Sequence, residues 1–223
     1  MVSMTENVDL TEQDLNRDFS AQREAQSREH ELERMLEQPF DGDEAALIRR
    51  VGFRFLIGED FRAHRREPFA PGLHALWVHR VGVHAQNLRA PLRQLARVFH
   101  RAGQLFCRNI YGIELEDTVR VGRRLEIGHQ SGIVIHRYAT IGHNCVIRQN
   151  VTFGVGTDWT EGRGPVIGNS VRFGVGTVVM GNVTIGNNVT IGPNCVISAD
   201  VPSDCTLFVP PPRVLPKAKP DNC

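Results

Sequence analysis

The chain has 223 residues, enough for one or two domains, and its formal net charge of +1 gives no electrostatic case for nucleic-acid binding. It contains no apolar run as long as a membrane span and no signal-peptide pattern after its first residue. The five cysteines are odd in number and have no metal-ligand spacing, which favours a reducing compartment, so we expect a soluble, cytoplasmic protein.

The first part of the chain predicts helices. Residues 1–43 are highly charged, and the run SAQREAQSREHELERMLEQ has only a thin apolar face, which predicts a solvated or partly disordered helical extension. Residues 44–110 are more apolar and predict an α-helical domain, interrupted by prolines at positions 68, 71 and 91. Its histidines have no second ligand at metal spacing, so we expect packing or surface roles for His74, His79, His84 and His100.

A six-residue repeat over residues 111–205 predicts the fold class. Large apolar residues recur every six positions, with smaller residues two positions before them. A helix would have a period of 3.6 and a strand a period of 2, whereas a hexapeptide period is typical of a parallel β-helix, here expected to be left-handed. Three hexapeptides make one triangular coil of about eighteen residues, so the repeat holds roughly five coils. The large series is Ile135, Ile141, Ile147, Phe153, Ile167, Phe173, Val179, Ile185, Ile191 and Ile197, and the small series is Ala139, Cys145, Val151, Val171, Thr177, Val183, Val189 and Cys195.

Corners of the β-helix are predicted from glycine and asparagine. Both residue types tolerate positive φ, which corners often need. We expect such corners at the glycines at positions 168, 174, 186 and 192 and at Asn182, Asn187, Asn188 and Asn194.

Two interruptions of the repeat mark candidate functional segments. An earlier register that ends at Ile133 is displaced by two residues from the later one, so residues 129–137 should be locally irregular. The repeat stops again at GVGTDWTEGRGP, which predicts a loop over residues 154–166, and insertions in repeat folds often form the binding face. Residues 206–223 form a proline-rich tail, which we expect to cap the last coil or to help bind an anionic cofactor.

His129, in the segment IGHQSGIVI, is the best candidate for chemistry. It lies at the register shift between Gly128 and Gly132, which permit close approach of a ligand. Glu114 lies fifteen residues earlier, close to one coil, from where a carboxylate could orient the imidazole. Such a pair could act as a general base on a hydroxyl, although the residues alone leave a surface histidine as the more common outcome.

Ordered motifs between Pro71 and Leu215 carry a resemblance to a known family: GLHALWVHR, GIEL, HQSGIVI, RQNVTFG, MGNVTIGNNVTIGPNCVI, DVP and VPPPRVL. With them, about two-thirds of the chain resembles the serine O-acetyltransferase family of hexapeptide-repeat acyltransferases. The resemblance implies an acyltransferase that transfers acetyl from acetyl-CoA to a hydroxyl by direct attack on the thioester, with no metal. It places His129 on the general base and Glu114 on its acidic partner.

The resemblance also implies an oligomer and a cofactor path. It implies a homotrimer, possible also as a dimer of trimers, with each active site in the groove between neighbouring β-helices. Acetyl-CoA would lie along the coils, with its pantetheine arm near Gly154, Gly174 and Val175. Thr190 stands where the family often has a lysine that contacts the CoA phosphates, and Arg213 in the tail is a further candidate contact.

The chain departs from the family pattern on the acceptor side. Gly128 replaces an aspartate that contacts serine, and His136 and Arg137 replace a Gly-Glu pair. Arg163 is followed by Gly164 where the family has a second histidine. Because an ammonium group binds best to carboxylates, we expect a pocket poorly suited to an amino acid.

These departures favour, slightly, a sugar or polysaccharide hydroxyl as acceptor, with Trp159 and Arg163 of the loop supplying stacking and hydrogen bonds. Two alternatives remain: a true serine O-acetyltransferase of cysteine biosynthesis, and a catalytically inactive hexapeptide scaffold that binds a partner. A metal enzyme of the γ-carbonic-anhydrase type ranks last, because His129, His136 and His143 are seven residues apart rather than at matching positions of successive coils.

Overall fold

The computed structural model describes residues 12–156 and 161–213, and the chain divides into two compact units, residues 1–38 and 39–223. In the first unit, helix α1 spans Glu12–Glu37. Its side chains are described from residue 22 onward, and nearly all of them are exposed. This exposure fits a segment whose charged residues leave only a thin apolar face.

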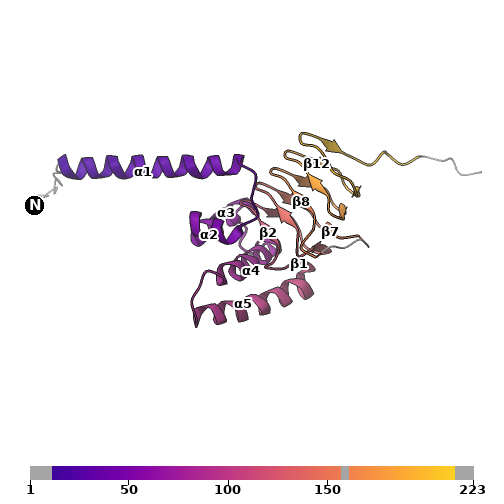
Figure 1. Cartoon of the computed structure of the whole chain (residues 1–223), viewed down its shortest axis with the longest axis horizontal. Helices are drawn as coiled ribbons and strands as arrows, with labels where there is room; N and C mark the ends of the chain where they lie inside the picture. The colour runs from indigo at the N-terminus through magenta and orange to yellow at the C-terminus, as the bar shows by residue number, and fades with distance from the viewer. Residues whose placement is uncertain (1–11, 157–160, 214–223) are drawn as a thin grey trace, which may run out of the picture. The chain divides into compact units, whose positions relative to one another are not determined.

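The described part of the second unit begins with helices that surround α4 (Figure 1). Asp43 caps the first of them by accepting a hydrogen bond from the Ala46 amide at 2.8 Å. Pro71 begins α4, where its missing N–H costs nothing, and Gly112 ends the helical region in the left-handed conformation. No helix among the described residues is long and apolar enough to cross a membrane. The helices are α2 (Glu44–Val51), α3 (Phe53–Ala63), α4 (Pro71–Ala85), α5 (Leu92–Phe106) and the π-helix η1 (Cys107–Tyr111).

The repeat region is a parallel β-helix of about five coils, which confirms the predicted fold class. Each of the first four coils contributes one strand to each of three sheets, and every pairing is parallel. The last coil adds a strand to two of the sheets and a single bridge, between Ile185 and Val201, to the other. The first sheet holds β1 (Ile113–Leu115), β4 (Ile133–Ile135), β7 (Thr152–Gly154), β10 (Val178–Met180) and β13 (Val196–Ile197). The second holds β2 (Arg120–Val121), β5 (Thr140–Ile141), β8 (Val166–Ile167) and β11 (Thr184–Ile185). The third holds β3 (Glu126–Ile127), β6 (Val146–Ile147), β9 (Arg172–Phe173), β12 (Thr190–Ile191) and β14 (Thr206–Leu207).

Both predicted apolar series form the interior of the β-helix. All ten members of the large series and all eight of the small series are buried. Phe153 of β7 and Phe173 of β9 come from different sheets and meet in the interior, with ring centroids 4.8 Å apart. Because each strand has only two or three residues, the coils are stable through stacking rather than through their own contacts.

Coil length varies where the sequence register breaks. Ile113 pairs with Ile133, an offset of 20 residues, whereas Ile135 pairs with Phe153, an offset of 18. The two additional residues lie in the corner between β3 and β4, where His129 and Ser131 have φ values of 68° and 86°. The predicted irregularity is therefore real, and it gives His129 a backbone conformation that non-glycine residues rarely adopt.

The glycines that follow the large series have a different role from the predicted one. None of those at positions 168, 174, 186 and 192 has positive φ. A Cβ at Gly174 would instead lie 2.6 Å from the Pro193 nitrogen of the next coil, and one at Gly168 would lie 2.7 Å from the Gly186 carbonyl carbon. These glycines permit close stacking of coils, and positive φ falls on other corner residues, including the predicted Asn188 and Asn194 but not Asn182 or Asn187.

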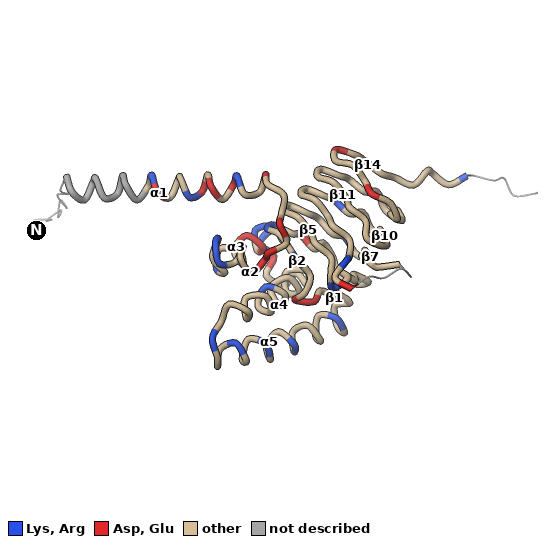
Figure 2. The backbone as a smooth tube through the Cα atoms, viewed as in Figure 1, with Lys and Arg blue, Asp and Glu red and all other residues tan. Residues whose placement is uncertain are grey.

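A buried charge network joins the helices to the first coil, where acidic and basic residues meet in Figure 2. Arg80 of α4 is 0% exposed and forms ion pairs with Glu44 (2.6 Å) and Asp60 (3.1 Å). Its guanidinium also donates to the carbonyls of Val121 and Gly122 in the first coil, at 2.8 and 2.7 Å. Burial alone would raise the pKa of Glu44, but the charges of His79 and Arg80 outweigh it and lower that pKa to about 2.

A second buried arginine follows Gly122 directly in the first coil, and it too pairs with a carboxylate of the helices. Arg123 is 0% exposed and donates to both carboxylate oxygens of Glu59, at 2.7 and 2.8 Å. The Arg123 amide donates to Nδ1 of buried His143 at 2.8 Å. Burial, followed by the positive charge of Arg123, lowers the pKa of His143 to about 4, so its ring is neutral at neutral pH.

Arg80→Ala should destabilise the protein strongly, because it leaves the buried carboxylates of Glu44 and Asp60 without their cation. We expect the free energy of unfolding to fall by about 3–5 kcal/mol, measured by denaturant unfolding. The control is Arg172→Ala on the exposed face of β9, for which we expect a change within about 0.5 kcal/mol. Equal effects of the two substitutions would contradict a structural role for the Arg80 network.

His143→Asn should remove part of the acid sensitivity of the fold, because the Asn carbonyl can replace Nδ1 as acceptor for Arg123 but does not titrate. Between about pH 6.5 and 4 the unfolded chain binds a proton at His143 that the folded chain does not, so stability falls as pH falls through this window. The thermal midpoint of the wild-type protein should therefore drop more between pH 7 and 4.5 than that of the variant. Parallel curves would show that His143 titrates normally.

Candidate active site

His129 lines a pocket of about 470 Å³ between the helices and the β-helix. One wall is the connection between α3 and α4, and the other is the irregular corner after β3. The side chain of His129 is exposed in the single protomer. The pocket is lined by Arg66, Glu67, Pro68, Phe69, Ala70, Pro71, Gly72, Ile127, His129 and Gln130.

Three contacts fix the helical wall of this pocket. Nδ1 of His64 donates to the Asp60 carbonyl at 2.8 Å, so Nε2 is free to accept the Ile127 amide at 3.1 Å. Nε2 of His74 lies 2.7 Å from the Pro68 carbonyl, to which it donates. Gly72 packs so closely on β3 that a Cβ would overlap the carbonyl oxygen of Ile127. The wall is thus attached to the strand that leads to His129.

The pocket contains a carboxylate that sequence reasoning missed. Glu67 and Arg66 both line it, and both side chains are exposed. The His129 pocket thus has a carboxylate besides those that the family pattern led us to look for. Nothing local to Glu67 in the sequence places it in this pocket, because it lines the same pocket as His129 only through docking of the helices on a strand some sixty residues later.

Glu114 is not joined to His129 in the single protomer. It lies in β1, is partly buried, and pairs in register with Val134, one coil above. No hydrogen bond or ion pair links Glu114 to His129 among the described residues. The spacing prediction took a coil as eighteen residues, whereas this coil has twenty, so the residue stacked on Glu114 is Val134. The role of Glu114 stays a prediction.

Arg137 and Arg163, which were predicted to bind the acceptor, lie at a different corner of the β-helix from His129. Arg137 follows β4, and its Nε lies 3.7 Å from Glu116. Arg163 is exposed and precedes Gly164, which packs on the backbone of Tyr138. Neither arginine lines the His129 pocket, and Trp159 lies outside the described residues. Gly128 adjoins His129 in the chain. Within one protomer, Arg137 and Arg163 lie away from His129.

The predicted cofactor contacts lie along the outside of the later coils. Gly154 ends β7, and Gly174 directly follows β9, beside the exposed Val175. Thr190 points outward from β12, and Arg213 is exposed beyond β14. Their contact with a cofactor stays a prediction.

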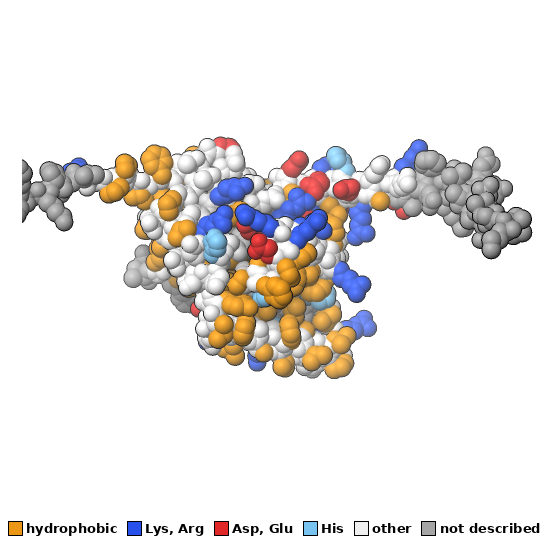
Figure 3. Space-filling model, turned by 180° about the vertical axis from the view of Figure 1, so that it is seen from behind, with side chains coloured by type: hydrophobic (Ala, Val, Ile, Leu, Met, Phe, Trp, Pro, Cys, Tyr) orange, Lys and Arg blue, Asp and Glu red, His pale blue; other side chains and the backbone are white. Residues whose placement is uncertain are grey.

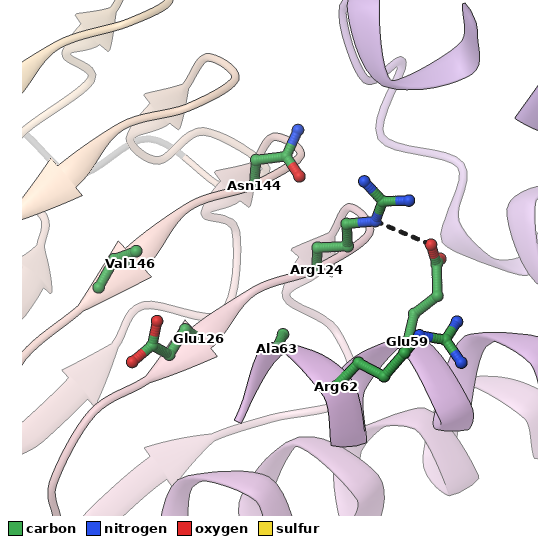
Figure 4. Close-up of a pocket in the computed structure, with 7 residues that line it drawn as sticks. All are labelled: Glu59, Arg62, Ala63, Arg124, Glu126, Asn144 and Val146. Atoms are coloured by element: carbon green, nitrogen blue, oxygen red, sulfur yellow. Dashed lines mark hydrogen bonds and ion pairs between the residues drawn. The ribbon is translucent and has the colours of Figure 1, made fainter. Parts of the chain in front are cut away.

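A second pocket, of about 360 Å³, lies where α3 meets the β-helix (Figure 4). Arg62 and Glu59 enter it from α3, and Arg124, Glu126 and Asn144 enter from the coils. Arg124 donates to Glu59 at 2.9 Å, so this pocket borders the charge network that holds the fold together. It contains none of the predicted site residues, and the His129 pocket is the better candidate active site.

Residues 164–199 match the family model described as bacterial transferase hexapeptide (six repeats). The serine acetyltransferase of Synechococcus elongatus is 39% identical over 146 residues, which make up 65% of this chain and 57% of that protein. The chain is related to the serine acetyltransferases. It spans less than two-thirds of the length of this relative.

Solved serine acetyltransferases have a similar fold. Isoform 3 from Entamoeba histolytica, in complex with cysteine, aligns with a TM-score of 0.63 at 28% identity and covers 78% of this chain and 64% of its own. The enzyme from Neisseria gonorrhoeae, in complex with serine, aligns with a TM-score of 0.59 at 27% identity and covers 75% and 71%. The family resemblance predicted from the motifs is confirmed.

Gly72→Ala should displace the helical wall of the pocket, because the new methyl group would overlap backbone rather than a mobile side chain. We expect a loss of about 1–3 kcal/mol in unfolding free energy. Gly58→Ala in α3 is the matched control, since its Cβ meets only Arg62 Nη1 at 3.6 Å and helix propensity favours alanine by up to about 1 kcal/mol. Denaturant unfolding compares the two, and an unchanged Gly72 variant would contradict the close packing on β3.

Proposed function

We propose that this protein is an O-acetyltransferase that transfers acetyl from acetyl-CoA to the hydroxyl of serine. The observation that carries the proposal is the pocket that combines His129, which matches the family's general base, with the carboxylate of Glu67. The relatives at 36–39% identity are named serine acetyltransferases, and one similar solved structure holds serine. The resemblance of motifs supports acetyl-CoA as the acetyl donor.

The reaction needs one proton acceptor close to the hydroxyl. In the proposed mechanism, His129 takes the hydroxyl proton as the serine oxygen forms a bond to the thioester carbonyl carbon. The carbon–sulfur bond then breaks, and the proton passes to the departing thiolate, which gives O-acetylserine and CoA. Glu114 is kept as the proposed partner that orients the imidazole, on the strength of the motif in which it lies.

The acceptor proposed here differs from the sugar hydroxyl that the sequence slightly favoured. A sugar hydroxyl was slightly favoured because the predicted pocket lacked carboxylates, but Glu67 lines it and can pair with an ammonium group. The relatives are named for serine, and nothing among them supports a sugar or polysaccharide acceptor. Serine is therefore the better-supported acceptor.

A homotrimer, in which a neighbouring protomer completes each site, is part of the proposal. Two observations support self-association. The predicted loop-side residues Arg137 and Arg163 lie at a different corner from His129. In addition, α5 and η1 expose large apolar side chains that single soluble chains rarely leave uncovered, and Figure 3 shows hydrophobic side chains gathered over the lower, helical part of the molecule. They are Leu92, Leu95, Val98, Phe99, Leu105, Phe106 and Ile110.

His129→Ala should reduce turnover by at least about 100-fold, because it removes the proposed base. The measurement is release of free thiol from acetyl-CoA with serine as acceptor, repeated with a panel of sugars and nucleotide sugars. His30→Ala, on the exposed surface of α1, is the control and should behave as wild type.

The outcomes separate the alternatives. Thiol release with a sugar but not with serine would overturn serine as acceptor. Unchanged turnover in His129→Ala would remove His129 from the mechanism. Failure of the wild-type protein to bind CoA or to release thiol with any acceptor would favour the inactive scaffold.

A further inference from the structure

Arg148 holds an unusual position on the outer surface of the β-helix. It directly follows the inward residue Ile147 of β6 in the third sheet. The corresponding residue of the coil below is Gly128, and those of the next two coils above are Gly174 and Gly192. A fifth member, Phe208, follows in the last coil, so Arg148 is the only residue with a side chain among the first four coils of this column.

The side chain of Arg148 lies over Gly128. A Cβ built on Gly128 would be 2.6 Å from Nη1 of Arg148 and 3.4 Å from its Cδ. Gly128 lies between Ile127 and His129, both of which line the candidate active-site pocket. The guanidinium therefore occupies the space next to the proposed base that a side chain at position 128 would otherwise fill.

The charge of Arg148 is not neutralised within the protomer. The buried arginines Arg80 and Arg123 each pair with a carboxylate. For Arg148, which is half-buried, no hydrogen bond or ion pair occurs among residues 22–156 and 161–213. A half-buried guanidinium without an anionic partner, placed beside a pocket, is suited to bind an anion, and its planar fork matches a carboxylate.

We infer that Arg148 is a specificity-determining residue that binds the carboxylate of the acceptor. This inference rests on the proposed function, because it assigns the acceptor held next to His129. Glu67, which lines the pocket, would then bind the ammonium group of a free amino acid, and Arg148, which lies over Gly128 beside the pocket, would bind its carboxylate. The phosphates of CoA are a less suitable partner, since the whole pantetheine arm separates them from the thioester that reacts at His129.

The test compares serine with serinamide, which keeps the hydroxyl and the ammonium but has no carboxylate. Wild-type protein should use serinamide poorly. Arg148→Gln should raise the KM for serine by about 10- to 100-fold, the usual size of a hydrogen bond to a charged group, with little change in kcat or in the KM for acetyl-CoA. In this variant serine and serinamide should become similar, and Arg148→Lys should recover part of the affinity for serine.

Two further measurements keep the outcomes distinct. Arg172→Gln changes an exposed arginine on β9 and should leave all constants unchanged, and equal melting temperatures would exclude misfolding of the Arg148 variants. Calorimetric titration of serine in the presence of CoA measures the same interaction without turnover. Unchanged serine affinity in Arg148→Gln, or a higher KM for acetyl-CoA alone, would overturn the inference. Absence of thiol release from wild-type protein with any acceptor would instead overturn the proposed function.

Discussion

The placement of Arg80 in a buried site between the helices and the first coil is the constraint on which the rest of the structure depends. Its guanidinium holds two carboxylates of the helical region and two carbonyl oxygens of the coil at once. Unpaired buried charges are costly, so the network is stable only when both parts are in place, and it disfavours other docking arrangements. Glu44 adds to this selectivity, because its carboxylate also accepts the backbone amide of Val121 at 2.9 Å.

The candidate site depends on this docking. The helical wall of the pocket follows directly from α3, which carries Asp60 and Glu59 of the two charge clusters. His64 then connects the end of α3 to β3 at Ile127, the residue before Gly128. The position of Glu67 relative to His129 therefore depends on the buried contacts of α3 as well as on the contacts of Pro68 and Gly72 at the pocket. A loss of docking would separate the two residues while leaving the later coils intact, because each coil contacts only its neighbours.

The sequence predicts the β-helix well and the docking poorly, for a physical reason. Each hexapeptide repeats the same pattern of large and small apolar residues, so the spacing alone assigns Ile167 or Val179 to the interior. His129 could be found because the register break is visible in the sequence. The ion pair of Arg123 with Glu59 joins residues 64 positions apart, and no local pattern indicates it. The residue paired with Glu114 is Val134, because the coil that holds the irregular corner has two more residues than the repeat implies.

The residues on the outside of the β-helix can vary beside the pocket while the scaffold is kept. Residues of the inward series cannot change size without disturbing the coils above and below them. Positions 128 and 148 lie outside the inward series, and Arg148 can lie over Gly128 only while that residue has no side chain. The glycine before His129 and the arginine one coil above it are therefore coupled. Together they place a positive charge near His129 without a change in the inward series, while Glu67 lines the pocket on its helical wall.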